Sequence, residues 1–146
     1  MSWIITLPST PVSGNVVMRM HFRAYREVLK GWFWKLRAAD GFKDIPKPTG
    51  KRKLTIQIHG IRLMDKENRY FACKPMVDVL RPPKIDAGIY KTGAKKGQVW
   101  TRERIGHGLV LDDDDAHLDL QVPPIEKLLK GGKPYIVLTF EDISNG

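Results

Sequence analysis

The sequence has little of several features that would define a compartment. Its only cysteine is Cys73, so no intramolecular disulfide can form, and a reducing, intracellular setting fits best. No apolar run approaches the roughly 18 residues that a membrane-spanning helix needs. Residues 1–7 lack a basic region followed by a longer apolar stretch, so no signal peptide is indicated. We therefore expect a soluble cytoplasmic protein.

Histidine is also sparse. The chain has four, which are His21, His59, His107 and His117. They are scattered and show none of the short spacings that zinc ligands have. The sequence therefore gives no support to a zinc site.

The charge is strongly one-sided. Lys and Arg number 25 against 16 Asp and Glu, which gives the 146 residues a formal net charge of +9. Such a balance suits a polyanionic partner, because each Lys or Arg that meets a phosphate releases condensed counterions. A basic solubility surface or a ribosome-type protein would share this charge. Charge alone favours nucleic-acid binding.

Hydrophobic periodicity predicts two strands and a helix in the first half. Residues 3–7 form a short apolar run that prolines close, which is typical of a strand. Apolar residues of 25–36 recur at helical spacing and predict a helix with one buried stripe. Residues 54–58 alternate as in a half-buried strand. The alternation resumes out of phase at Ile61 and Leu63, which favours a bulge or bend near Gly60.

The second half carries one more helix, a long basic insert and two strands. Cys73, Met76, Val77 and Leu80 predict a helix, in which Pro75 either begins the regular part or kinks a helix begun near Asn68. Residues 81–107 show no clear periodicity. Residues 118–122 and 135–140 follow as strands, with a Gly131–Gly132 turn between them. We expect one α+β domain over 1–146, with two main helices against a mixed sheet.

Two acidic groups stand out in this basic chain. Asp65 and Glu67 follow the second strand, and Asp112 to Asp115 form a run before a later strand. Carboxylates near a DNA-binding face repel phosphate, so their clustering suggests bound Mg²⁺ or Mn²⁺. A solvated acidic turn would give the same pattern.

An ordered set of motifs resembles the RusA family of Holliday junction resolvases. Asp65-Lys66-Glu67-Asn68 and Lys74-Pro75-Met76-Val77-Asp78-Val79-Leu80 are similar to that family's Asp-x-Asp-Asn and Lys-Pro-x-x-Asp-x-Leu elements. Gly108-Leu109-Val110-Leu111-Asp112-Asp113 is similar to its Gly-x-x-x-Asp-Asp element. Ser13-Gly14-Asn15 and Arg19-Met20-His21-Phe22 resemble an opening of phage-type members.

The resemblance implies a catalytic set. Asp65, Glu67 and Asp113 match the family's catalytic carboxylates, which would hold Mg²⁺, and Lys74 matches its essential lysine. A metal lowers the pKa of its bound water and so generates hydroxide to attack the phosphorus. The lysine would offset charge that grows on the phosphoryl oxygens. Asp115 is an alternative to Asp113 as the third carboxylate.

Three further residues would support that set. Asp78 lies one helical turn after Lys74 and would orient the lysine. Asn68 would serve as a helix cap or as a donor behind the metal ligands. Asp112 adjoins Asp113 and, like Asn68, is expected to support the metal ligands without binding the metal itself.

The chain departs from the family pattern in two ways. Glu67 stands where the family usually has Asp, and its extra methylene moves the carboxylate oxygens by about one carbon–carbon bond length, which matters for phosphoryl transfer. The second departure is the basic insert, because the family usually joins the helix to its Asp-Asp element by a short turn. The sequence leaves open whether the insert is an ordered arm or a mobile loop.

Several residues are candidates for DNA contact, which are Lys91, Lys95 and Lys96 of the insert together with Arg19 and His21. Trp34 and Trp100 are candidates for base stacking, since Trp32 lies on the buried stripe.

We expect a magnesium-dependent endonuclease that resolves four-way DNA junctions as a homodimer. The dimer comes from the resemblance alone. One alternative is a junction-binding protein of the same fold whose nuclease is weakened by Glu67. Another is a basic RNA-binding protein whose acidic turns are merely solvated.

Overall fold

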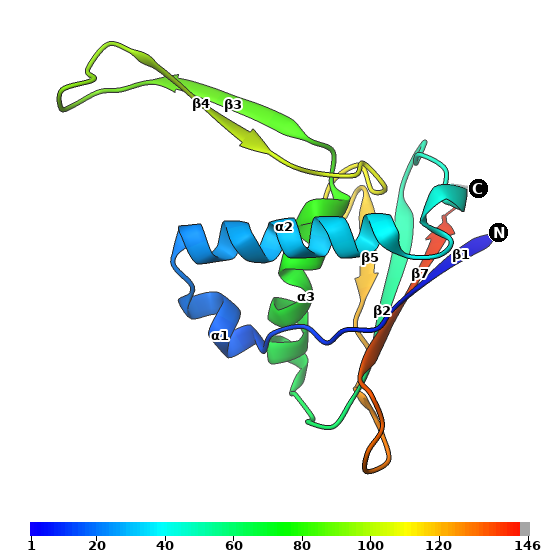
Figure 1. Cartoon of the computed structure of the whole chain (residues 1–146). Coiled ribbons are helices and arrows are strands. Elements are labelled where there is room, and N and C mark those ends of the chain that lie inside the picture. The colour runs from blue at the N-terminus through cyan, green and yellow to red at the C-terminus, as the bar shows by residue number, and fades with distance from the viewer. Residues whose placement is uncertain (144–146) are drawn as a thin grey trace.

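The computed structural model describes residues 1–143 as an α+β domain with one mixed sheet (Figure 1). The helices are α1 (Gly14–Arg19), α2 (Phe22–Ala38) and α3 (Lys66–Leu80), with a 3-10 turn η1 (Phe42–Asp44). The strands are β1 (Ser2–Leu7), β2 (Arg52–Gly60), β3 (Lys84–Ile89), β4 (Val99–Arg104), β5 (Leu118–Gln121), β6 (Glu126–Lys127) and β7 (Tyr135–Asp142). The predicted fold class, with two long helices, is confirmed.

The main sheet has the order β1-β7-β2-β5, and β6 pairs with the far end of β2. β1, β7 and β2 run antiparallel, while β5 and β6 run parallel to β2, so the sheet is mixed. Leu54 lies opposite Phe140 and Ile56 opposite Leu138, and all four are fully buried. This apolar face of the sheet forms the core with the two long helices.

The apolar stripe of α2 faces the core as its spacing predicts. Trp32 and Leu36 are buried, and Val28, Leu29 and Phe33 pack partly against the core. The opposite face carries exposed Lys and Arg side chains. The amphipathic pattern therefore orients this helix.

α3 begins at Lys66 and contains Pro75 in its interior, so the helix starts well before the proline. Asp65 caps it, because its side chain accepts a hydrogen bond of 2.8 Å from the backbone N–H of Asn68. Pro75 has no N–H for the carbonyl one turn earlier, and burial of its neighbours against the sheet offsets that loss.

The expected bend near Gly60 is present at Ile61 and Arg62, but the apolar alternation beyond it does not continue as a strand. β2 ends at Gly60, and Ile61 and Leu63 are 56% and 67% exposed on the connection to α3. Their apolar alternation has no partner strand, so it does not indicate a strand.

The basic insert is an ordered arm. β3 and β4 pair antiparallel from Lys84↔Arg104 to Ile89↔Val99 and project from the body as a two-stranded ribbon (Figure 1). Strands of six residues give the ribbon a length of about 20 Å. The sequence predicted neither this ribbon nor α1, η1 and β6.

None of the helices among residues 1–143 is both long and apolar enough to cross a membrane.

Candidate functional site

A small cavity of about 210 Å³ lies between α3, β5 and the loop that precedes β5. Its lining combines apolar side chains with one lysine and two aspartates, and consists of Tyr70, Phe71, Lys74, Val77, Asp78, Asp113, Leu118 and Leu120. Lys74, Asp78 and Asp113 were all predicted from the sequence as site residues. The fold brings them to one place, although Asp113 is distant from the other two in the chain.

α3 supplies one wall of this cavity through its helical repeat. Tyr70, Lys74 and Asp78 are spaced by four residues and therefore lie on one face of the helix. The Lys74 Nζ lies 3.7 Å from Asp78 Oδ1, and the lysine is half exposed while the aspartate is only 14% exposed. Asp78 thus positions Lys74 from the buried side and leaves the ammonium group of the lysine accessible to an anion.

The loop of residues 109–117 supplies the other wall and is anchored at both ends. The backbone N–H of Leu109 donates to the Leu80 carbonyl at 2.8 Å, and the buried Arg52 donates from Nη1 to the Leu109 carbonyl at 2.9 Å. At the other end, the N–H of Arg52 donates to the His117 carbonyl at 3.1 Å. These bonds fix the acidic run beside α3.

Arg81 joins the two walls and is a residue that sequence reasoning missed. Its guanidinium lies 3.2 Å from Asp112, 3.7 Å from Asp113 and 3.8 Å from Asp78. The arginine is only 18% exposed. An Arg three residues after an acidic helix position is the signal that could have found it, because i,i+3 pairs meet on a helix.

Tyr25 of α2 contacts the carboxylate oxygen of Asp78 that does not face Lys74 and Arg81. Its hydroxyl donates a hydrogen bond to Asp78 Oδ2. Burial, with the nearby Asp78 carboxylate, raises the pKa of Tyr25 far above its usual value, so the phenol stays protonated. The sequence assigned Tyr25 only to the buried stripe. Asp78 therefore holds Lys74, Arg81 and Tyr25 together.

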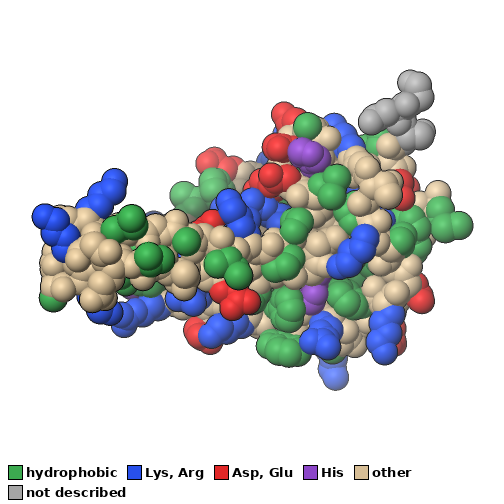
Figure 2. Space-filling model, turned by 90° about the horizontal axis from the view of Figure 1, so that it is seen from above, with side chains coloured by type: hydrophobic (Ala, Val, Ile, Leu, Met, Phe, Trp, Pro, Cys, Tyr) green, Lys and Arg blue, Asp and Glu red, His purple; other side chains and the backbone are tan. Residues whose placement is uncertain are grey.

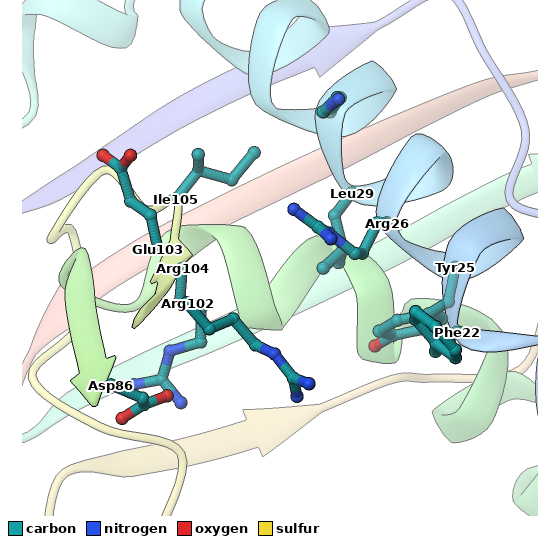
Figure 3. A pocket seen from close by; sticks show the side chains of 10 residues that line it. Phe22, Tyr25, Arg26, Leu29, Asp86, Arg102, Glu103, Arg104 and Ile105 are labelled. Carbon is teal, nitrogen blue, oxygen red and sulfur yellow. The ribbon is translucent and has the colours of Figure 1, made fainter. Parts of the chain in front are cut away.

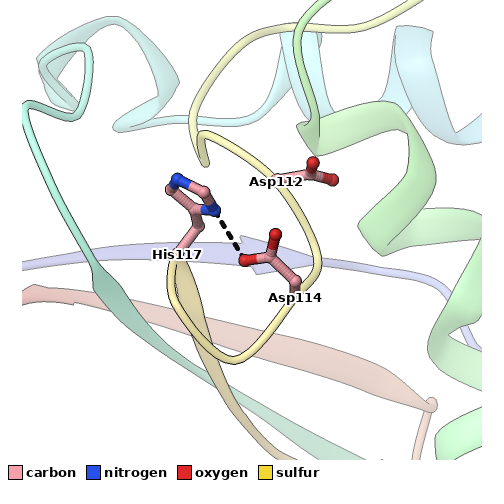
Figure 4. A group of neighbouring side chains, drawn as sticks. All are labelled: Asp112, Asp114 and His117. Atoms are coloured by element: carbon pink, nitrogen blue, oxygen red, sulfur yellow. Dashed lines mark hydrogen bonds and ion pairs between the residues drawn. The ribbon is translucent and has the colours of Figure 1, made fainter.

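The acidic run contains a compact group of possible metal ligands. Asp112, Asp114 and His117 each offer a ligand atom within 4.8 Å of the others, and His117 Nδ1 lies 2.5 Å from Asp114 Oδ1 (Figure 4). A hydrogen bond of 2.8 Å from the backbone N–H of Asp113 lowers the pKa of Asp112, and the charges of Arg81 and His117 lower it further. Asp112 is therefore a carboxylate at neutral pH.

The other predicted carboxylates lie at the N-terminal end of α3 and do not line the cavity. Asp65 caps the helix, and Glu67 stands exposed in its first turn. Nine residues separate Asp65 from Lys74, which is about 13 Å along a helix axis. Asn68 accepts a hydrogen bond of 3.0 Å from the backbone N–H of Asn15, so it ties α1 to α3.

The predicted metal set does not meet at one point. Within residues 1–143, ligand atoms gather only at Asp112, Asp114 and His117, and neither Asp65 nor Glu67 joins them. Two carboxylates suit either Mg²⁺ or Mn²⁺, and the imidazole of His117 favours Mn²⁺. The loop thus brings three possible ligand atoms within reach of one ion, whereas the set Asp65, Glu67 and Asp113 does not gather.

The predicted DNA contacts lie on exposed parts of the chain. Lys91, Lys95 and Lys96 lie at the tip of the arm, and blue side chains mark that tip in Figure 2. Arg19 ends α1. His21 caps α2, because its Nδ1 accepts a hydrogen bond of 3.3 Å from the backbone N–H of Arg23.

A second cavity, of about 290 Å³, lies between α2 and the base of the arm (Figure 3). Phe22, Tyr25, Arg26 and Leu29 line it from α2, while Asp86, Arg102 and Arg104 line it from the arm. The arm wall of this cavity mixes two arginines with the carboxylates of Asp86 and Glu103, and α2 adds Arg26 and Lys30.

No family model, no curated protein and no solved structure matches this chain.

Proposed function

We propose that this protein is a metal-dependent DNA endonuclease that cuts branched DNA, with its centre at the cavity between α3 and the acidic loop. The observation that carries the proposal is that Lys74 and Asp113 line one cavity. The resemblance to the RusA family assigns these two residues an essential lysine and a catalytic carboxylate. A fixed cation and a carboxylate side by side can position a phosphodiester for hydrolysis.

The charge of the arm supports a DNA substrate. Residues 81–107 hold seven basic and two acidic residues, so the arm carries much of the chain's excess positive charge. The arm leaves the body directly after α3 and returns directly before the acidic loop, beside the cavity. Phosphate contacts along it would hold a duplex next to the centre.

The residues around the cavity have distinct tasks in this proposal. Lys74 meets a non-bridging phosphate oxygen and offsets the charge that grows there. Asp78, which accepts a hydrogen bond from Tyr25, keeps the lysine in place. Arg81 neutralises part of the acidic loop, so that a phosphate can approach Asp113.

A divalent cation would be held by Asp112, Asp114 and His117, and it would supply a polarised water near the phosphorus. Asp65 and Glu67 lie at the N-terminal end of α3, and their carboxylates do not join this group of ligand atoms. The proposal includes a homodimer, as the resemblance implies, because a four-way junction has two-fold symmetry and calls for paired centres. It also includes a cytoplasmic location.

The test uses labelled four-way junctions and linear duplexes of matched sequence, with Mg²⁺, Mn²⁺ or EDTA. We expect cutting of the junction with Mg²⁺ or Mn²⁺ and none in excess EDTA. Lys74→Ala and Asp113→Asn should each lower the cutting rate at least 100-fold, on the order of the loss seen when one transition-state donor is removed. Lys43→Ala, which changes an exposed lysine of η1, is the matched control.

The separation of Asp65 and Glu67 from the cavity favours one alternative, a junction-binding protein that does not cut. Tight junction binding without cutting by any divalent ion would establish that alternative. A preference for RNA that is indifferent to Asp113 would instead favour the basic RNA-binding protein.

A further inference from the structure

The two faces of the arm differ in chemistry because side chains alternate along its strands. One face presents the pairs Lys84 with Arg104, Asp86 with Arg102 and Gly88 with Trp100. The other face presents Ile85 with Glu103, Ala87 with Thr101 and Ile89 with Val99. The first of these, which we name the basic face, carries all the arginines of the ribbon.

Trp100 packs against its own ribbon because Gly88, the residue opposite it, has no side chain. A Cβ at Gly88 would clash with the indole ring of Trp100, so the ring lies close over the backbone of β3. The ring is therefore partly buried, although the ribbon is only two strands thick. Glycine inside a strand often marks such a close approach. The packing fixes the orientation of the indole before any ligand arrives.

An open hollow of about 530 Å³ lies beside this ring. Its lining includes two aromatic and two cationic residues, Trp100, Tyr90, Lys91 and Arg102, together with Gly88, Ile89 and Thr101. Flat aromatic rings next to cations are the means by which proteins hold nucleic-acid bases with their phosphates.

The position of the hollow also points to DNA. Arg102 lines both this hollow and the cavity between the arm and α2, so the two adjoin at this arginine. Across that cavity, α2 adds Arg26 and Lys30. A nucleic-acid strand that follows the basic face would thus meet positive charge from two elements.

We propose that the hollow binds one unpaired nucleotide of DNA, with its base stacked on Trp100 and its flanking phosphates at Lys91 and Arg102. In a continuous duplex each base is covered by its neighbours and shows only its edges in the grooves. A ring that offers a stacking surface therefore selects a base that has left the stack, as at a branch point or a strand end. This inference rests on the proposed function and adds a means by which the protein recognises branched substrates.

The test measures binding by the full-length protein of a single-stranded DNA 12-mer, a four-way junction with two unpaired nucleotides at its centre, and a linear duplex. Trp100→Ala should weaken binding of the first two by about 5- to 150-fold, the range for removal of one stacking interaction, and change duplex binding less than twofold. Trp100→Phe should retain most of the affinity. Quenching of fluorescence by the 12-mer should be present in the wild type and largely absent in Trp100→Phe.

Val99→Ser is the matched control, because Val99 is 69% exposed on the other face of the same strand. It should leave all three affinities unchanged. An equal loss on duplex and on unpaired DNA in Trp100→Ala would overturn the inference, as would unchanged affinity for all three. Tighter binding of an RNA 12-mer than of the DNA 12-mer, with the same dependence on Trp100, would overturn the assignment to DNA. Normal cutting of junctions, together with unchanged affinity of Trp100→Ala for the 12-mer and for the junction with unpaired nucleotides, would refute this inference alone, whereas a failure to bind or cut any junction would refute the proposed function.

Discussion

Replacing Arg81 by Met should destabilise the protein through the loss of one ion pair in particular. The Arg81–Asp78 pair has exposures of only 18% and 14%, whereas Asp112 and Asp113 are 43% and 40% exposed. Breaking a buried pair by removing one partner costs about 3–5 kcal/mol, and exposed pairs contribute little. Asp78 keeps Lys74 and Tyr25 as partners, so we expect a loss of about 2–3 kcal/mol, at or just below the lower end of that range.

Thermal and urea unfolding check this value. For a chain of this size the loss corresponds to a fall in Tm of roughly 6–10 °C. Asp78→Asn in the Arg81→Met background should restore part of the stability, because it removes the unpaired buried charge. Lys84→Met is the control, since Lys84 is 60% exposed in its pair with Asp86 and should change Tm little. A Tm for Arg81→Met equal to that of the control would refute the role given to Arg81.

The remaining predictions concern the acidic loop, the first turn of α3, the arm and one half-buried histidine. Asp113→Asn should abolish most cutting and spare junction affinity, whereas Asp115→Asn should stay active; the reverse result in a cutting assay would move the carboxylate to Asp115, which does not line the cavity. Glu67→Gln should lower the cutting rate little if the centre lies at the loop, and a severe loss restored by Glu67→Asp would return Glu67 to the metal site. Lys91→Ala, Lys95→Ala and Lys96→Ala together should weaken junction binding and flatten the slope of log affinity against log salt, measured by titration at several salt concentrations, by about 0.9 unit for each phosphate that these lysines neutralise. Burial lowers the pKa of His107 below its usual value, so the unfolded chain binds more protons between the two pKa values; stability should fall as the pH drops through that window, and denaturant unfolding of His107→Gln should show a smaller fall.

The sequence predicted those parts of the fold in which apolar spacing and burial coincide. Residues 54–58 and 135–140 alternate and are buried on one side, so both strands were identified. The ribbon was missed because its alternate residues, such as Ile85 and Ile89, remain exposed and its connection has none of the short turn signals of a hairpin.

The candidate site was predictable to a similar extent. Motif order pointed to Lys74 and Asp113, and both line the cavity. Arg81 and Tyr25 were missed, because their link to Asp78 depends on how α2 crosses α3 and on where the loop docks. The distance of Asp65 from Asp113 depends on the direction of α3 relative to β5, which no local pattern encodes.

The way the base of the arm is fastened has a consequence for deleting or replacing the arm. One end of the ribbon continues from α3, and the returning end is fastened to the close of that helix by hydrogen bonds from His107 N–H to the Val79 carbonyl at 2.8 Å and from Gly108 N–H to the Arg81 carbonyl at 3.1 Å. Gly106 permits this, since a Cβ there would clash with the Arg81 carbonyl. Lys84 and Arg104 already lie opposite each other, so a two-residue Asn-Gly link could join them in place of residues 85–103. The arm could thus be removed while the cavity of Lys74 and Asp113 stays intact. A different DNA-binding element could then be grafted at the same position.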